Sequence, residues 1–172
     1  MRWNFRTDEE RRMELIDFLK MYMGSLTTCL DKIARLPCYT AEEQIRIREQ
    51  IIDIMQTMYP ARDYLSQGAI LGSEYYMIAS LYVGLGKHEN ALSALEKAGE
   101  QFNYCDSHDG THVSLAFRGC NRGRMHTDER SYRGEFLEML CRDSTFDPLR
   151  ENPRYTEILN QLNTSQSGED RS

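Results

Sequence analysis

A cluster of side chains that can bind metal or act as nucleophiles lies between residues 105 and 126. Zinc sites in proteins are built mostly from four Cys or His ligands, and these residues are close enough in sequence to converge on one ion. Their spacing matches no standard zinc finger and includes no Cys-x-x-Cys pair, so a simply polar loop is the competing interpretation. The members are Cys105, Asp106, His108, His112, Cys120 and His126.

The same cluster offers cysteine and histidine for nucleophilic catalysis. Such a pair needs a third group that orients the base and donors that stabilise an oxyanion, and no local pattern supplies either. The chain also contains no glycine-rich phosphate loop, no G-x-S-x-G turn and no H-E-x-x-H pair. We therefore expect no enzymatic activity and no cofactor. A metal-binding protein or enzyme built on residues 105–126 is the alternative.

Arginines are concentrated within and just after this cluster, with Asp128 and Glu129 as the acidic residues among them. They would suit contact with an acidic partner or a phosphate backbone, or a solvated loop that pairs with the acidic body of the protein. The net charge of −6 repels nucleic acid. We therefore expect no direct nucleic-acid binding by this chain. The arginines are Arg118, Arg122, Arg124, Arg130 and Arg133.

The composition is that of a single globular domain. The 172 residues are 40% hydrophobic and 28% charged, and no apolar run approaches the ~20 residues that cross a bilayer. The N-terminal segment is too charged for a signal peptide. Five scattered cysteines are then more consistent with reduced thiols than with a disulfide framework. These features predict a cytoplasmic protein with no membrane contact.

The first half of the chain has the periodicity of amphipathic helices. Apolar residues recur at spacings of three and four over residues 10–35 and again over 41–58. Thr40, with Glu43 three residues later, forms a capping box that predicts where the second helix begins. Residues 61–72 have a loop-like composition.

The second half mixes helical and irregular segments. Residues 103–134 are rich in polar residues and glycine, which predicts an irregular excursion with one short helical turn. A helix is expected at 133–141. Asp147–Pro148 and Asn152–Pro153 each place a capping residue before a proline, a signature of a helix start. The tail, residues 163–172, has nothing to bury and is expected to be disordered.

The clearest pattern covers residues 75–98. Two helical runs are separated by Gly86, which permits a tight turn, and Ala79 and Ala91 fall where the two helices would cross closely. These positions resemble the tetratricopeptide repeat, a helix–turn–helix unit of about 34 residues. Because such a unit cannot bury its own face, the resemblance implies degenerate units on both sides. These are residues 10–58 and residues 132–162, the latter including a C-terminal capping helix.

A second resemblance covers residues 30–162. The segments "LPCYTAEEQIRIREQIIDIMQTMYP" and "FDPLRENPRYTEILNQL" resemble the C-terminal half of Xre-type helix-turn-helix transcriptional regulators of Gram-positive bacteria. In such regulators a phage-repressor-like DNA-binding domain precedes a tetratricopeptide-like domain. No segment before residue 30 predicts the short helices and tight turn of a DNA reader. The resemblance therefore implies the sensing part of a regulator or a free-standing relative.

Together these features predict an all-α protein with one domain at residues 1–162. The expected architecture is a short right-handed α-solenoid of tetratricopeptide-like hairpins. The expected function is non-enzymatic: peptide or protein interaction and sensing, or self-association. In such repeats the first helix of each pair lines the binding face, which points here to Ser73, Tyr76, Ser80 and Val83. The competing interpretation is that neighbouring helices cover this stripe and make it core.

Overall fold

The computed structural model describes residues 7–108, 111–118 and 131–164, and within these ranges it is helical, with no β-strand. The all-α prediction is confirmed. Of the predicted tail, residues 163 and 164 end the last helix and the rest lies outside the described residues. The α-helices are α1 (Asp8–Ala34), α2 (Ala41–Met58), α3 (Gly68–Gly84), α4 (His88–Ser107), α5 (Tyr132–Arg142) and α6 (Pro153–Thr164). The 3₁₀ turns are η1 (Leu65–Gln67), η2 (Leu115–Phe117) and η3 (Ser144–Leu149).

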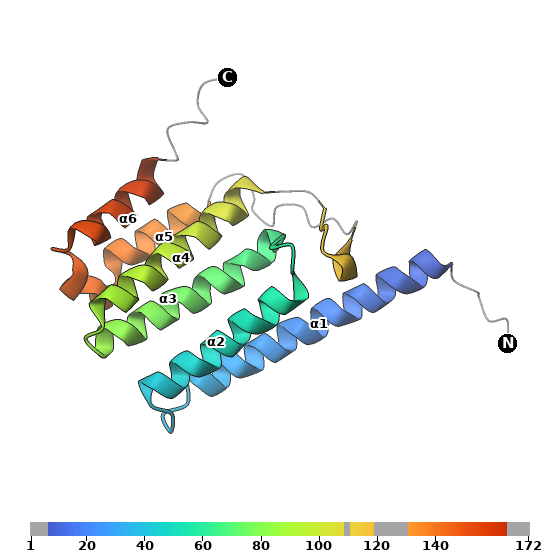
Figure 1. Ribbon diagram of the computed structural model, residues 1–172, viewed down its shortest axis with the longest axis horizontal. Helices are drawn as coiled ribbons and strands as arrows, with labels where there is room; N and C mark the ends of the chain where they lie inside the picture. Colours follow the sequence, from blue (N-terminus) through green and yellow to red (C-terminus); the bar gives the residue numbers. More distant parts are fainter. Residues whose placement is uncertain (1–6, 109–110, 119–130, 165–172) are drawn as a thin grey trace, which may run out of the picture.

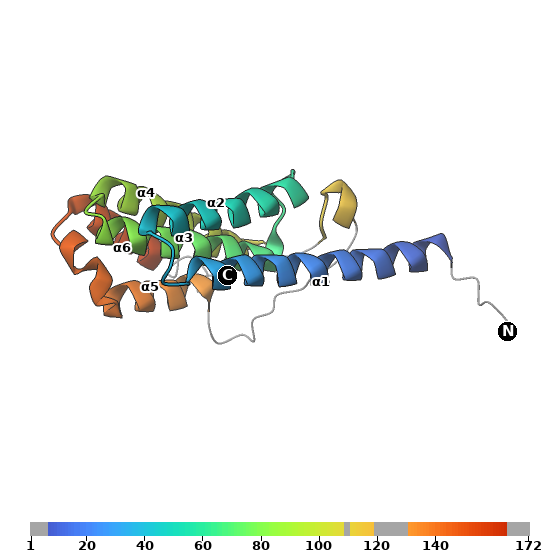
Figure 2. The same ribbon diagram turned by 90° about the horizontal axis from the view of Figure 1, so that it is seen from below.

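Consecutive helices lie side by side along the chain, so that α1 and α6 are at opposite ends of the stack (Figure 1). Seen from below, α2 and α4 lie on one side of the stack and α1 and α5 on the other (Figure 2). Buried apolar side chains from all six helices form one core. The N-terminal part of α1 extends beyond α2, and the η2 turn lies beside it. None of the described helices combines the length and apolar character that crossing a membrane requires.

The starts of α1 and α2 are fixed by capping boxes. Thr40 accepts a hydrogen bond from the Glu43 backbone N–H, and the Glu43 carboxylate accepts one from the Thr40 N–H. Thr7 and Glu10 form the same reciprocal pair before α1. The capping box predicted before residue 41 is thereby confirmed. Gly24 lies within α1 without interrupting it.

A buried ion-pair network joins the first three helices. Arg48 of α2 is 1% exposed, and its Nη1 donates to Asp31 of α1 at 2.9 Å and to Glu74 of α3 at 2.6 Å. Burial raises the pKa of Glu74 above its usual value, although the Arg48 charge opposes this. One guanidinium therefore fixes the relative placement of α1, α2 and α3.

The pairing of α3 with α4 depends on small residues. Ala79 and Ala91 are fully buried, as the close crossing requires, and Gly86 has φ +69° at the turn between the helices. Gly72 is a further point of close approach, because an added Cβ would lie 2.7 Å from the Phe102 ring. The loop predicted at 61–72 is wrong from residue 68 onward, because glycine there serves helix packing rather than a turn.

The prediction of an irregular segment at 103–134 is wrong for residues 103–107, because α4 continues to Ser107. The predicted short helical turn is η2. Asn152–Pro153 does begin a helix, with the Asn152 side chain accepting from the Arg154 N–H at 2.9 Å. Asp147–Pro148 does not, because Pro148 lies inside η3, whose N-cap is Asp143.

Candidate functional site

The four residues predicted to bind a partner lie along one side of α3, with spacings of three, four and three. Ser73 is exposed, and Tyr76, Ser80 and Val83 are half-buried. The Ser73 hydroxyl donates to the Ala69 carbonyl at 2.9 Å. None of the four side chains is buried in the described part of the structure. The strip therefore borders on solvent.

Tyr76 is held by contacts with the C-terminal part of the chain. Its ring lies 6.1 Å from that of Phe136, edge to face, and 5.5 Å from that of Phe146. Its hydroxyl donates a hydrogen bond to the Asp143 carboxylate. Burial and this hydrogen bond raise the pKa of Tyr76, so the phenol stays protonated. Tyr76 is therefore a fixed wall of the site rather than a freely rotating side chain.

The carboxylate that Tyr76 binds remains ionised. Burial acts to raise the pKa of Asp143, but hydrogen bonds from Tyr76 and Thr145 outweigh it and lower the pKa. A neutral donor and a charged acceptor form a strong hydrogen bond. This bond connects α3 to the turn between α5 and η3.

An open groove of about 510 Å³ begins at Tyr76 and runs along α5. Three of its lining residues are acidic, and its single cation, Arg142, pairs with Glu138 at 3.3 Å. The groove therefore favours basic and apolar groups. We call it the α3–α5 groove; its lining residues are Tyr76, Glu135, Glu138, Met139, Arg142 and Asp143.

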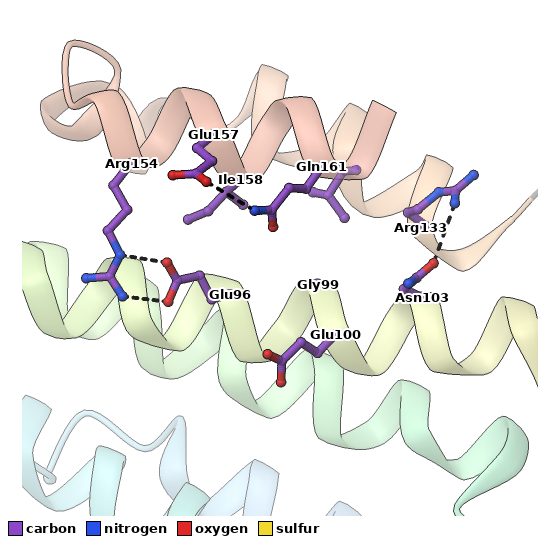
Figure 3. A pocket seen from close by; sticks show the side chains of 10 residues that line it. Glu96, Gly99, Glu100, Asn103, Arg133, Arg154, Glu157, Ile158 and Gln161 are labelled. Atoms are coloured by element: carbon purple, nitrogen blue, oxygen red, sulfur yellow. Dashed lines mark hydrogen bonds and ion pairs between the residues drawn. The ribbon is translucent and has the colours of Figure 1, made fainter. Parts of the chain in front are cut away.

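A second groove of about 410 Å³ lies between α4 and α6 (Figure 3). At one end Arg154 is bidentate to Glu96, at 2.6 and 2.5 Å, and its guanidinium also reaches Glu89 at 3.1 Å. At the other end the buried Arg133 lies 3.5 Å from the Asn103 amide oxygen. The positive charge of Arg154 is thus already neutralised by Glu96 and Glu89. No local sequence signal pairs Arg154 with acids some 60 residues earlier, so sequence reasoning missed this groove.

The predicted metal cluster is not assembled by the described residues. Cys105 is buried, and its thiol donates to the Leu65 carbonyl at 3.3 Å. Burial raises the pKa of Cys105 to about 12, so the sulfur stays protonated at neutral pH. His108 is exposed at the end of α4, where its ring stacks on Tyr104 at 4.1 Å. Cys120 and His126 lie outside the described residues.

Asp106 has a structural role that its sequence position does not reveal. Its two carboxylate oxygens accept the backbone N–H groups of Tyr132 and Arg133, each at 2.9 Å. These groups belong to the first turn of α5, whose N–H groups have no partner within the helix. Asp106 thus joins the end of α4 to the start of α5.

His112 belongs to a buried cluster that sequence reasoning missed. Its Nδ1 lies 2.8 Å from the Asp63 carbonyl, and the Asp63 carboxylate accepts from the backbone N–H and the hydroxyl of Ser114. Burial lowers the pKa of His112, so the ring is neutral. Serine, histidine and aspartate are the residue types of a catalytic triad. Here, however, the Ser114 hydroxyl donates to the Asp63 carboxylate instead of to the His112 ring. The cluster therefore holds residues 111–118 against the segment that follows α2.

Two of the predicted arginines lie in the described ranges, and they do not form a common patch. Arg118 is exposed, and its carbonyl accepts a hydrogen bond from Arg12, whereas Arg133 is buried. Among the described residues, no group of three or more His, Cys, Asp or Glu side chains could hold a metal ion. No family model, curated protein or solved structure matches the chain. The geometry of α3 and its neighbours therefore carries the functional argument.

Proposed function

We propose that this protein is a non-enzymatic interaction domain that binds a peptide or protein segment along α3 and the α3–α5 groove. The helical hairpins α1–α2, α3–α4 and α5–α6 would form a short right-handed solenoid of tetratricopeptide-like units. The packing of each helix on the next along the chain supports this description. In such a stack the first helix of each pair lines the binding face.

The observation that carries this proposal is the partly exposed strip on α3 formed by Ser73, Tyr76, Ser80 and Val83. This helix packs against α2, α4 and η3, and a helix so enclosed would ordinarily be apolar on every side. It instead leaves Ser73 exposed and Ser80 half-buried. Small hydroxyl residues allow the backbone of a ligand to approach closely and offer directional hydrogen bonds.

The chemistry of the neighbouring groove indicates the kind of segment that would bind. Glu135, Glu138 and Asp143 attract basic side chains, while Met139 offers an adaptable apolar contact. The Tyr76 ring, fixed by Phe136 and Phe146, needs no ordering when a ligand arrives. A segment that alternates basic and apolar residues fits this surface.

The resemblance to Xre-type regulators extends the proposal to regulation. A segment bound between α3 and α5 would favour one relative placement of these helices. Such a shift in population is how ligand binding could be passed to a DNA-binding domain. The chain described here would be the sensing part of that system.

The binding proposal can be tested with a displayed library of short peptides selected against the purified chain. Peptides recovered by the wild-type protein are expected to combine basic and apolar residues. Their affinity should fall at least about tenfold, or ~1.4 kcal/mol, for the Ser73→Arg/Ser80→Arg variant, which adds positive charge and bulk to the strip. Thr156→Arg, on the exposed side of α6, is the matched control and should bind normally.

Equal binding of the selected peptides to wild type and to Ser73→Arg/Ser80→Arg would place the binding site elsewhere. Far-UV circular dichroism separates this result from misfolding. The single variant Ser73→Arg is expected to keep its helical spectrum, because Ser73 is exposed and an arginine at this position can extend into water.

A further inference from the structure

The outward side of α1 carries an apolar stripe in which one spacing pattern occurs twice. Leu15, Phe18 and Tyr22 are followed eleven residues later by Leu26, Cys29 and Ile33. An eleven-residue repeat corresponds to about 3.67 residues per turn, close to the helical value of 3.6, so the side chains stay on one side of the helix. We call these six residues the α1 stripe.

The α1 stripe is exposed along its whole length in the described part of the structure. Leu15, Tyr22 and Leu26 are 62%, 65% and 47% exposed. The opposite side of α1 is the one that packs, with Ile16 and Met23 buried in the core. A contiguous apolar surface of this kind is typical of an interaction site.

The other end of the stack has the opposite character. The exposed side of α6 is polar within the described residues, and terminal helices of helical stacks normally present such a face to water. The exposed residues of α6 that show this are Thr156, Glu157, Asn160, Gln161 and Asn163. The stack is therefore closed by polar residues at α6 and left open at α1.

Charges beside the α1 stripe change sign along the helix. On one flank, Glu14 and Asp17 lie in the first half of α1 and Lys32 lies in its last turn; Arg35 follows and already pairs with Asp31 at 2.9 Å. Two helices that pair antiparallel bring the same flank of each together, head to tail. Each acidic half would then face a basic half, whereas a parallel pair offers no such match.

We propose that the α1 stripe packs against the α1 stripe of a second copy of this chain, antiparallel and related by a two-fold axis near residue 24. This arrangement is isologous, so each contact occurs twice. With the axis near residue 24, residues 14–34 of the two α1 helices overlap, which gives a contact line of about 30 Å. The expected pairs are Leu15 with Ile33, Phe18 with Cys29, Tyr22 with Leu26 and Glu14 with Lys32.

The size of this surface suits a dimer. An aromatic side chain carries about 150–250 Å², so a half-exposed one offers on the order of 100 Å². The stripe with its flanking side chains thus approaches the ~800 Å² per partner of a standard interface. A hollow of about 420 Å³ lies at the edge of the stripe and is bordered by Glu14, Asp17, Phe18 and Met21. Four residues at positions i, i+3, i+4 and i+7 of a helix form the kind of hole that receives a side chain from a facing helix.

Sedimentation velocity across a range of concentrations tests the dimer. The wild-type chain is expected to sediment as a dimer, and the Tyr22→Lys/Leu26→Lys variant as a monomer with unchanged helical content. Val113→Lys, at an apolar residue 60% exposed outside α1, is the matched control and should remain dimeric. A monomeric wild type, or a dimeric double variant, would contradict the proposal. This test needs no peptide ligand, so its outcome is independent of the proposed function.

Disulfide trapping tests the antiparallel register. In a chain with Cys38, Cys120 and Cys141 changed to serine, Phe18→Cys is expected to form an intermolecular disulfide with Cys29 of the second copy under mild oxidation by oxidised glutathione. Adding Cys29→Ser should abolish it. Equally fast crosslinking through Cys29 alone, or no crosslinking with Phe18→Cys, would contradict this register.

Discussion

At the scale of single residues, several groups that suggest chemistry in the sequence have structural roles. Asp106 completes the start of α5, and the buried Cys105 thiol donates to a carbonyl. His112 also has a structural role, because its neutral ring is buried beside Asp63 and the Phe117 ring. Its burial makes stability depend on pH.

We expect the protein to lose stability as the pH falls below about 6.5, the value at which an unfolded histidine titrates. Burial lowers the pKa of folded His112, so the unfolded chain binds more protons in this range. The nearby Lys20 acts in the same direction, while Asp63 opposes it. Urea unfolding at about pH 7.5 and about pH 5.5 measures the effect.

His112→Gln should retain a donor near the Asp63 carbonyl and reduce the difference between the two pH values. His108→Gln, at an exposed position, is the matched control and should leave it unchanged. If His112→Gln keeps the full pH dependence, another group is responsible.

Ala91 is the residue that most directly reports the close crossing of α3 and α4. It is fully buried, so Ala91→Leu should overpack the crossing and cost about 1–3 kcal/mol. For a chain of this size each kcal/mol lowers the melting temperature by about 2–4 °C. Asn90→Leu, at the exposed neighbouring position, is the control. Equal melting temperatures for the two variants would contradict the crossing.

At the scale of helices, one buried arginine connects the first two hairpins. Arg48 binds Asp31 and Glu74, which lie on the helices before and after its own. Removing one member of such a network leaves charge buried without its partner. The contact between α1–α2 and α3–α4 therefore depends on polar as well as apolar groups.

Glu74→Ala is expected to destabilise the protein by about 3 kcal/mol in urea unfolding, because the buried Arg48 keeps only Asp31. Glu74→Gln retains a hydrogen-bond acceptor and should cost less. Glu42→Ala, which removes an exposed ion pair with Lys87 at 4.0 Å, should cost less than about 1 kcal/mol. Similar losses for Glu74→Ala and Glu42→Ala would show that the network does not hold the hairpins together.

Local signals in the sequence predict most helix boundaries. Two such signals are confirmed: the capping box of Thr40 and Glu43, and the helix start at Asn152–Pro153. Each involves only residues within one helical turn of each other. The predicted loop is wrong at Gly72, because a glycine that admits the Phe102 ring has the same sequence signal as a turn residue until the neighbouring helix is known. The helix start predicted at Asp147–Pro148 is wrong, because an aspartate followed by a proline also fits a short 3₁₀ turn.

The candidate site was less accessible to sequence reasoning. Spacing alone places Ser73 and Ser80 on one side of α3, and in the structure Ser73 is exposed and Ser80 is half-buried. The partner of Tyr76 is Asp143, 67 residues later, and no periodicity relates the two. The His112–Asp63 contact likewise spans 49 residues. Contacts between distant segments arise from the packing of whole helices and leave no local pattern.

At the scale of the whole molecule, the surface charge limits the partners that can bind. With a net charge of −6, the chain is expected to show no sequence-specific DNA binding at physiological salt. A gel-shift assay with one duplex and its scrambled counterpart measures this. Selective retention of one duplex would mean that the chain contains a DNA-reading surface after all.

The two proposed interaction surfaces lie apart in the whole molecule. The α1 stripe lies at one end of the stack, and the α3–α5 groove lies near the other. A dimer through α1 would leave α5 and α6 distant from the interface. Two copies could therefore each bind a segment without competing for the same surface.

The central claim, that a segment binds along α3 and α5, is tested most directly by NMR. Amide chemical shifts of the isotope-labelled protein are followed as a library-selected peptide is added. The account predicts that the largest changes include Ser73 and Ser80 on α3, and Met139 and Arg142 on α5. Changes confined to the groove of about 410 Å³ that α2, α3 and α4 line around Asp53, Tyr82 and Lys97, or to the groove between α4 and α6, would contradict it.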